Sequence, residues 1–161
     1  MALLELKNLK TFFATKRGTV KAVNGVSYSL DAGKVLGVVG ESGSGKSVSA
    51  MSILRLLDGN GYIDSGEILF NGQDLTKLSM NEMYKIRGNE ISVIFQEPMT
   101  SLNPVFTVSR QISEPLMIHQ GMNKKQAAAK AVELLSDVKI PNPEVVAKQY
   151  PHQLSGGMRQ R

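Results

Sequence analysis

The chain has 161 residues, of which 42% are hydrophobic and 20% are charged, and it contains no cysteine. These values are ordinary for one soluble domain, and they exclude an intrinsically disordered chain, a disulfide scaffold and any site that needs a thiolate. The net charge of +5 lies mostly in residues 119–161, which carry seven basic and three acidic side chains. Because these lysines are spread out without interleaved aromatics, they indicate a solvated face and not a nucleic-acid interface.

Neither a membrane-spanning segment nor a metal centre is expected from the sequence. No stretch reaches the roughly 18 consecutive apolar residues that crossing a bilayer needs, and Glu5 interrupts the first apolar residues. We expect the two histidines, His119 and His152, to be structural, as is Tyr150. The sequence thus favours a cytosolic chain that stays out of the secretory route.

The N-terminal part of the chain alternates between apolar and polar side chains. Leu4, Leu6 and Leu9 are followed by a second alternating stretch over 20–30, and this pattern predicts two strands of a partly solvated antiparallel sheet. A further strand is predicted over 66–70, with Asn71 and Gly72 forming its turn.

Two short runs, 35–39 and 91–95, are apolar on both faces. Such runs predict strands that are buried in the middle of a sheet. The first leads directly into a glycine-rich loop, and the second ends at Gln96 and gives way to a proline-bearing loop over 97–106.

Helical periodicity predicts the other elements. A helix over 48–57 should follow the glycine-rich loop, and Ser79 with Glu82 should form a capping box. Three more helices should occupy the rest of the chain, so residues 1–96 are predicted to be an α/β core and 97–161 a helical subdomain. The predicted N-caps of those three helices are Thr107, Asn123 and, with Pro143 after it, Asn142.

The strongest motif lies between the apolar run 35–39 and the helix that follows. It fits the pattern G-x-x-x-x-G-K-[ST], in which glycines let successive backbone N–H groups converge on a phosphate. Lys46 would reach the β- and γ-phosphates, and the hydroxyl of Ser47 would bind Mg²⁺. The motif therefore predicts a site for ATP or another nucleoside triphosphate with magnesium, formed by Gly40, Glu41, Ser42, Gly43, Ser44, Gly45, Lys46 and Ser47.

A second glycine-bearing motif stands near the end of the chain and consists of Leu154, Ser155, Gly156, Gly157 and Met158. A serine and two glycines that lead into a helix would provide another helix N-terminus for an anion, although a plain turn would fit this motif alone equally well. The order of the motifs is more specific. A phosphate loop, a run ending at Gln96 and this signature after a helical segment together resemble the nucleotide-binding domain of ATP-binding cassette (ABC) transporters.

The resemblance covers the whole chain and is closest to the ATP-binding subunits of oligopeptide and dipeptide importers, a group that includes nickel importers. It rests on the stretches 40–47, 95–104 and 150–158. It implies an α/β P-loop NTPase core of the ABC ATPase type, with an N-terminal antiparallel β subdomain and an all-helical subdomain.

The resemblance also implies roles for individual residues. Phe13 would stack on adenine, although Phe12 is a rival and a core aromatic is the alternative. Gln96 would approach Mg²⁺ and the attacking water, and the loop over 97–106 would contact an integral membrane permease. The signature Ser155-Gly156-Gly157 would bind the γ-phosphate held by a second ABC ATPase domain.

The resemblance also implies residues that family members carry after the signature. These are an Asp-Glu pair that supports Mg²⁺ and activates water, and a histidine that senses the γ-phosphate. Since this sequence does not contain them, we expect it to be the N-terminal part of a longer ATPase. It should have little turnover of its own, and the backbone at 35–39 should be unpaired. The parent would lie at the cytoplasmic face of the membrane and depend on a solute-binding protein indirectly.

Other readings explain less of the sequence. A P-loop kinase or GTPase would share Lys46 and Ser47 but would leave Gln96 and the signature unexplained. An ABC-type ATPase of chromosome maintenance or DNA repair would place a long coiled coil between Gln96 and the signature, where this chain is short. An importer of another solute such as nickel, or a nucleotide-binding module without hydrolysis, stays open.

Overall fold

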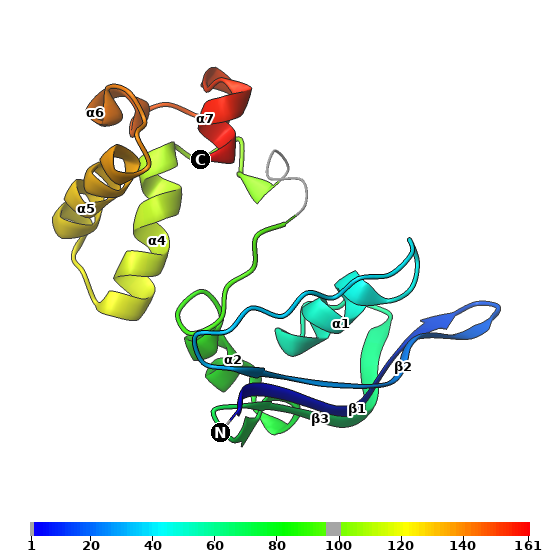
Figure 1. Ribbon diagram of the computed structural model, residues 1–161. Coiled ribbons are helices and arrows are strands. Elements are labelled where there is room, and N and C mark those ends of the chain that lie inside the picture. The colour runs from blue at the N-terminus through cyan, green and yellow to red at the C-terminus, as the bar shows by residue number, and fades with distance from the viewer. Residues whose placement is uncertain (1, 96–100) are drawn as a thin grey trace. The chain divides into compact units, whose positions relative to one another are not determined.

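The computed structural model describes residues 2–95 and 101–161. They belong to two compact units, one that runs to Tyr84 and one that begins at Lys85 (Figure 1). In the described part of the chain, no helix is both long enough and apolar enough to cross a membrane.

The first unit is built on an antiparallel sheet whose strands follow the order β2-β1-β3-β4 (Figure 1). The predicted N-terminal strands and the turn at Asn71 and Gly72 are confirmed, and the strand predicted over 66–70 begins earlier, at Gly61. Leu6 on β1 is paired with Ile68 on β3, and both side chains are buried in the core of this unit. The strands are β1 (Ala2–Thr15), β2 (Gly18–Asp31), β3 (Gly61–Phe70) and β4 (Gln73–Asp74).

Helix α1 (Lys46–Ile53) packs against this sheet and is tied to it by a buried hydrogen bond of 2.8 Å between the hydroxyls of Thr11 and Ser52. The helix ends earlier than the predicted 48–57. Arg55 adopts a left-handed φ of 52°, and the N–H of Leu56 donates to the carbonyl of Met51. This Schellman arrangement stops the helix although the apolar spacing continues.

Two apolar runs differ from their prediction. Neither 35–39 nor 91–95 forms a strand, and Val35, Val39 and Ile94 are 98%, 93% and 95% exposed. The physical reason is that neither run has a neighbouring strand among residues 2–95 and 101–161, so neither has a backbone ladder or an apolar face to pack against. An apolar pattern indicates a buried strand only where such neighbours exist.

The end of the first unit contains the 3-10 helix η1 (Leu75–Lys77) and the start of helix α2 (Met80–Ile86). The predicted capping box is confirmed: the N–H of Ser79 donates to Glu82 Oε2 at 2.8 Å, and the N–H of Glu82 donates to Ser79 Oγ at 3.3 Å. Each side chain therefore satisfies a backbone donor that the first helical turn leaves open.

Asp74 caps η1. Its carboxylate accepts from the N–H of Thr76 at 3.1 Å and from Thr76 Oγ1 at 2.8 Å, and its other oxygen lies 2.9 Å from Lys77 Nζ. Burial alone would raise the pKa of Asp74, but the ion pair and the hydrogen bonds hold that pKa below its ordinary value. The ionised carboxylate therefore stabilises this unit.

Replacing Asp74 should reveal this contribution and its pH dependence. Asp74→Ala should lower the free energy of unfolding by about 1–2 kcal/mol at neutral pH. A carboxylate whose folded pKa is lowered contributes stability above its unfolded pKa of about 3.9 and loses that contribution as the pH falls through the folded pKa. Urea unfolding at neutral pH and at about pH 2.5 should thus show a difference that shrinks in acid.

The matched control is Asp64→Ala, because Asp64 is exposed on β3. This change should alter stability by no more than about 0.5 kcal/mol at either pH. An Asp74 effect that stayed constant or grew in acid would show that the ionised carboxylate is not its source.

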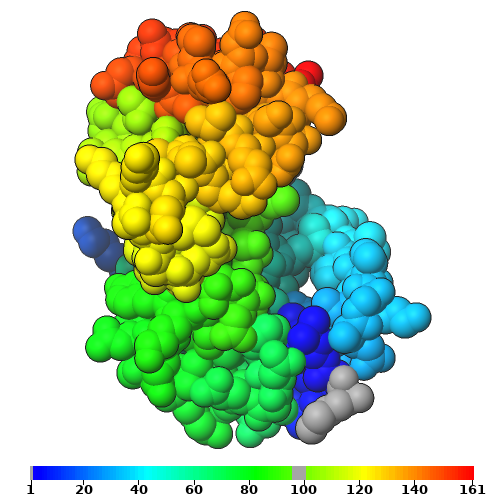
Figure 2. Space-filling view, turned by 90° about the vertical axis from the view of Figure 1, so that its left-hand side faces the viewer, coloured from blue at the N-terminus to red at the C-terminus, as the bar shows by residue number. Residues whose placement is uncertain are grey.

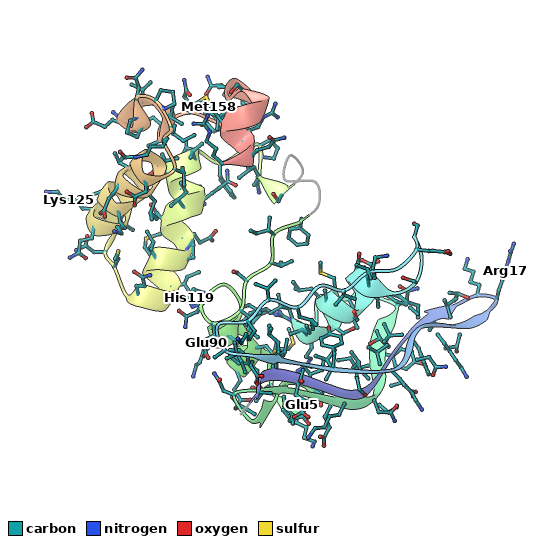
Figure 3. All side chains as sticks on the ribbon, viewed as in Figure 1. Glu5, Arg17, Glu90, His119, Lys125 and Met158 are labelled. Atoms are coloured by element: carbon teal, nitrogen blue, oxygen red, sulfur yellow. The ribbon has the colours of Figure 1, made fainter. Side chains whose placement is uncertain are left out.

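The second unit is helical, with α4 packed against α5 (Figure 1). Its core consists of Val108, Leu135, Ile140, Val146, Ala147 and Leu154. The side chains of its yellow and orange helices pack side by side on the face that Figure 2 shows. Lys125 projects from α5 into solvent, as the spread of lysines predicts (Figure 3). The elements are α4 (Val108–Gln120), α5 (Lys124–Asp137), α6 (Pro143–Val146), the 3-10 helix η2 (Pro151–Gln153) and α7 (Gly156–Gln160).

All three predicted N-caps are confirmed, but Asn142 caps α6 without a side-chain hydrogen bond. The side chains of Thr107 and Asn123 cap α4 and α5, and Gln126 completes a capping box at Asn123. Asn142 is the N-cap of α6, with Pro143 as the first helical residue, but it has a left-handed φ of 49° and its side chain makes no cap hydrogen bond. The proline after it disfavours right-handed helical geometry at Asn142, and the left-handed region that asparagine tolerates is not the extended geometry that a capping side chain needs.

Candidate functional site

The loop over 40–47 reverses the chain and starts α1. Gly43 and Gly45 have left-handed φ values of 81° and 89°, which side chains with a Cβ rarely adopt, and the N–H of Ser44 donates to the carbonyl of Glu41 at 3.2 Å. Gly45 is the N-cap of α1, and no side chain caps that end of the helix. The first-turn N–H groups of α1 are therefore free of a side-chain partner, an arrangement that suits a bound phosphate.

The loop lies directly on strand β2. A Cβ at Gly45 would come within 2.3 Å of the carbonyl oxygen of Ala22, and a Cβ at Gly40 would come within 2.8 Å of Ser44 Oγ. Because the backbone of β2 leaves no room for a side chain, the position of the loop is fixed by the sheet. Only a glycine at residue 45 permits this approach.

Lys46 curls over the loop that it follows. Its Nζ donates to the carbonyls of Gly40 and Glu41, each at 2.7 Å, and to Ser44 Oγ at 3.4 Å. The ammonium group is therefore positioned over the same loop whose N–H groups favour an anion. The side chain of Ser47, the next residue on α1, is exposed and free to bind a metal ion held by phosphate oxygens.

A cavity of about 470 Å³ opens beside the loop. Its volume falls within the roughly 300–1,000 Å³ that small-molecule sites occupy. Burial raises the pKa of Tyr28 on its wall, and a hydrogen bond with Ser49 opposes that shift. The walls come from β2, from the extended segment before the loop and from α1, and include Lys21, Ala22, Val23, Asn24, Val26, Tyr28, Val38, Val39 and Ser49.

The contribution of β2 to this cavity is absent from the sequence-based prediction. The alternation over 20–30 indicates a strand, but it does not indicate which face of the strand meets a loop that follows it in the chain. The close approach of Gly45 to Ala22 supplies that information, and it can be seen only in three dimensions.

Phe13 lies elsewhere in the same unit. It is half-buried and pairs with Gly61 on β3, where a Cβ would come within 2.7 Å of its ring. It is not among the residues that line the cavity beside the loop. Its rival Phe12 is buried against Tyr62, with ring centroids 6.2 Å apart. The adenine-stacking role of Phe13 stays a prediction.

Gln96 lies outside the described residues, as do residues 97–100. The described end of the following loop is held by Gln111, whose side chain accepts from the N–H of Asn103 and donates to its carbonyl, both at 2.9 Å. Val105 in this loop is 69% exposed. The loop thus presents an apolar side chain to solvent from a backbone that α4 holds in place.

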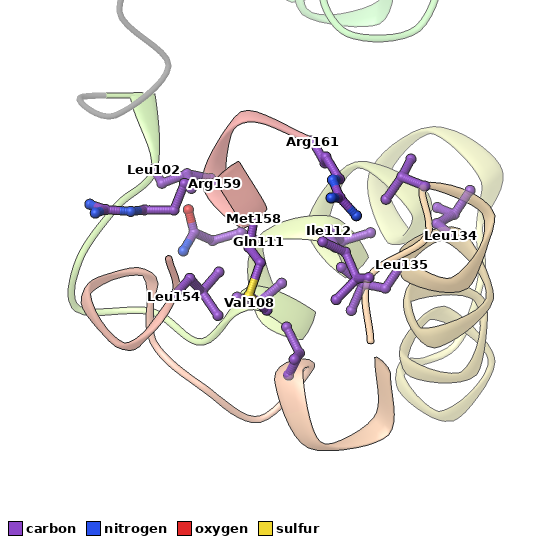
Figure 4. A pocket seen from close by; sticks show the side chains of 13 residues that line it. Leu102, Val108, Gln111, Ile112, Leu134, Leu135, Leu154, Met158, Arg159 and Arg161 are labelled. Carbon is purple, nitrogen blue, oxygen red and sulfur yellow. The ribbon is translucent and has the colours of Figure 1, made fainter. Parts of the chain in front are cut away.

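The signature motif begins helix α7 in the second unit. Ser155 is the N-cap, and its Oγ accepts from the N–H of Met158 at 3.3 Å. Leu154 is buried in the helical core, and Met158 packs against it. Both side chains also line a cavity of about 280 Å³ in this unit (Figure 4). Leu154 and Met158, at the two ends of the motif, therefore hold it against the core of the second unit.

The middle of the signature is exposed. Ser155, Gly156 and Gly157 all face solvent, and a Cβ built at either glycine would meet nothing within 4 Å. Neither glycine has a positive φ. The fold of this chain therefore does not require glycine at these positions. Two glycines in a helix are nevertheless unusual, because glycine destabilises a helix.

The residues present fit a nucleoside triphosphate with magnesium. The loop offers one ammonium group, and the N-terminus of α1, which no side chain caps, adds its partial positive charge. Among residues 2–95 and 101–161, no three histidine, aspartate or glutamate side chains gather as a metal site. The Ser47 hydroxyl is suited to hold a magnesium ion together with oxygens of the phosphate itself.

Comparison with known proteins agrees with this geometry. A family model described as ABC transporter matches residues 23–161. The oligopeptide transport ATP-binding protein AppD of Bacillus subtilis (strain 168) is 51% identical over 160 residues, which are 99% of this chain and 49% of that protein. The dipeptide transport ATP-binding protein DppD of Lactococcus lactis subsp. cremoris (strain MG1363) is 52% identical over 98% of this chain and 46% of that protein. The chain spans about half the length of these curated relatives.

Solved structures give the same result. The dimeric structure of a bacterial ABC transporter cassette is similar with a TM-score of 0.80 and 26% sequence identity, and the match covers 98% of this chain and 65% of that chain. A dimeric post-hydrolysis state of an ATP-binding cassette bound to ADP and Pi matches with a TM-score of 0.78 at the same identity and coverage.

Proposed function

This chain belongs to the ABC transporter family, and from that premise we propose that it is part of the ATP-binding subunit of a peptide importer. The subunit couples the binding and hydrolysis of MgATP to the transport of oligopeptides or dipeptides. The observation that carries the proposal is the loop over 40–47, which has two left-handed glycines, an ammonium group bonded to its carbonyls and a helix end without a side-chain cap. The peptide substrate is proposed from the names of the relatives, one an oligopeptide and one a dipeptide transport protein.

In this proposal the loop holds the triphosphate. Lys46 neutralises charge on the β- and γ-phosphates, and Ser47 binds Mg²⁺. Phe13 stacks on adenine, and Gln96 approaches Mg²⁺ and the attacking water. Bound magnesium offsets the negative charge that develops on the phosphate oxygens. The chain's own contribution is to bind and orient the triphosphate.

The exposed signature supports a second part of the proposal. A Cβ at Gly156 or Gly157 would meet open space, so the missing side chains leave room for a group that binds from outside this chain. The approaching group is the γ-phosphate held by the loop of a second ABC ATPase domain, so bound ATP joins two domains and its hydrolysis releases them. The dimeric structural relatives support this arrangement.

Coupling to transport needs a membrane partner. We assign this contact to the loop over 97–106, which belongs with 107–161 to the helical subdomain, whereas 1–96 form the ATP-binding core. The exposed Val105 offers the permease an apolar contact on a backbone held by Gln111. The subunit would thus lie peripherally at the cytoplasmic face of the membrane, with a solute-binding protein engaged only through the permease.

Replacing a signature glycine tests the proposal, because stability and function should change in opposite directions. Gly157→Ala should raise the stability of the chain by up to about 1 kcal/mol, since alanine is the better helix former and its Cβ meets no atom. The same change should reduce the association of chains that MgATP induces, because the methyl group occupies the approach of the γ-phosphate. Thermal melts and sedimentation velocity with and without MgATP measure the two effects.

The control is Ala129→Gly on α5, an exposed position remote in sequence from the signature. It should lower stability by about 1 kcal/mol and leave the MgATP-induced change in sedimentation unaltered. If Gly157→Ala gained stability and associated with MgATP as well as wild type does, the proposed role of the signature would be wrong.

A further inference from the structure

The side chain of Gln111, near the start of α4, is bonded to the backbone of the loop that precedes this helix. Its Oε1 accepts from the N–H of Asn103 at 2.9 Å, and its Nε2 donates to the carbonyls of Asn103 and Phe106, each at 2.9 Å. Both N–H donors of the amide and its carbonyl oxygen are therefore in use. Among side chains, only glutamine and asparagine combine an acceptor with two donors in one amide group, and asparagine is shorter by one methylene.

The bonded end of the loop also has a defined conformation. Asn103 Oδ1 accepts from the N–H of Val105 at 3.1 Å, a bond that is typical of an asparagine turn. The guanidinium group of Arg110 lies 3.8 Å from the centroid of the Phe106 ring. Arg110 is exposed and acts on a side chain, whereas Gln111 is half-buried and acts on the backbone. Gln111 therefore sets the position of the loop backbone relative to α4.

Helix α4 begins on the backbone that leads to the signature. The N–H of Val108 donates to the carbonyl of Gln149 at 2.9 Å, and the N–H of Ser109 donates to the carbonyl of Ala147 at 2.8 Å. These are N–H groups that the first turn of an α-helix leaves without an intrahelical partner. Val108 also shares the core of this unit with Leu154, the first residue of the signature. The start of α4 and the signature therefore belong to one packed body.

We propose that Gln111 is a positioning residue for transport, and that it joins the loop over 101–106 to the signature. The inference rests on the proposed function, in which this loop contacts the permease and the signature meets a γ-phosphate. A displacement that the permease imposes on the loop passes to α4 through the Gln111 side chain, and to the signature through the backbone bonds of Val108 and Ser109. Without Gln111 the loop would absorb the displacement itself, because packed elements transmit a shift and a free loop does not.

Gln111→Leu tests whether this side chain holds the loop. It removes all three hydrogen bonds and keeps a side chain of similar size. The Asn103 amide should then exchange its proton at least about threefold faster in this chain, as measured by hydrogen exchange and NMR. Gln111→Glu is the second variant, because it keeps the length and an acceptor but loses both donors. It should release the loop as well, with faster exchange of the Val105 amide.

The matched control is Gln126→Leu, the same substitution in the same unit. Gln126 Oε1 accepts from the N–H of Asn123 at 3.0 Å at the start of α5, so this change also removes a bond from a glutamine side chain to the backbone. It should leave the exchange of the Asn103 amide unchanged. Unaltered loop exchange in both Gln111 variants would overturn the positioning role, as would a rise that Gln126→Leu reproduces.

The link to transport is tested in the complete importer, with the subunit assembled on its permease in lipid vesicles. Gln111→Leu should lower the permease-stimulated kcat for MgATP at least about fivefold and leave KM within about twofold, because the loop over 40–47 is untouched. Gln126→Leu should change neither value. A general loss of folded protein would lower turnover with and without the permease alike, so the ratio of the two rates isolates the positioning role.

Two outcomes separate the inference from the function on which it rests. Wild-type turnover that does not respond to the permease would overturn the proposed function and the inference with it. A wild type that the permease stimulates, together with an equally stimulated Gln111→Leu, would overturn the inference alone.

Discussion

MgATP should raise the melting temperature of this chain by roughly 5–10 °C when its concentration exceeds the dissociation constant a hundredfold, and Lys46→Ala should remove that shift. The shift corresponds to about 2.7 kcal/mol of ligand-linked stabilisation. It depends on an ammonium group that already lies over the loop, bonded to Gly40 and Glu41. A thermal melt followed by circular dichroism, with and without MgATP, measures it.

The control is Lys21→Ala, which removes another lysine from the wall of the same cavity but not from the loop. Its shift with MgATP should resemble that of the wild type. Equal shifts in wild type and Lys46→Ala would show that the nucleotide binds without the loop lysine and would contradict the proposed site. No shift in either protein would show that residues 40–47 do not hold a nucleotide in this chain.

Gly45→Ala should destabilise the first unit by at least about 3 kcal/mol and abolish nucleotide binding. The left-handed φ of 89° accounts for part of this cost, and the approach of the new Cβ to within 2.3 Å of Ala22 O accounts for the rest. Because the new Cβ would clash with the backbone of β2 and not with a flexible side chain, the loop would have to move away from the strand. Urea unfolding and the MgATP melt together measure both consequences.

Gly43→Ala is the matched variant. Gly43 has a similar φ of 81°, but a Cβ there would meet nothing within 4 Å. Its cost should therefore be only the conformational part, about 1–2 kcal/mol. Equal costs at residues 43 and 45 would mean that the contact with β2 does not hold the loop in place.

The predicted fold class is confirmed by the likeness to ABC cassettes, yet the accuracy of the prediction varies with the range of the interactions. The antiparallel strands and the caps at Ser79, Thr107 and Asn123 were predictable because they depend on alternation or on residues three apart. The runs 35–39 and 91–95 were not, because a buried strand depends on neighbouring strands that are distant in sequence.

For the candidate site, too, the local features could be predicted from the sequence and the long-range ones could not. The loop over 40–47 could be located from residue types alone, since glycines and a lysine at fixed spacing act through their own backbone. The cavity wall on β2 could not, because it depends on how closely Gly45 approaches Ala22. Phe13 does not line that cavity, and its position likewise depends on its pairing with Gly61 across the sheet.

The hydrogen bonds of Lys46 to the loop carbonyls affect the entropy of binding. A free lysine side chain has about 2 kcal/mol of rotamer entropy, and most of that freedom is lost once its Nζ is held at 2.7 Å from two carbonyl oxygens. The loss takes place when the chain folds, before any phosphate arrives. A ligand that meets this restrained cation avoids most of the ordering cost, and in return it must replace at least one of the three bonds that the ammonium group donates within the loop.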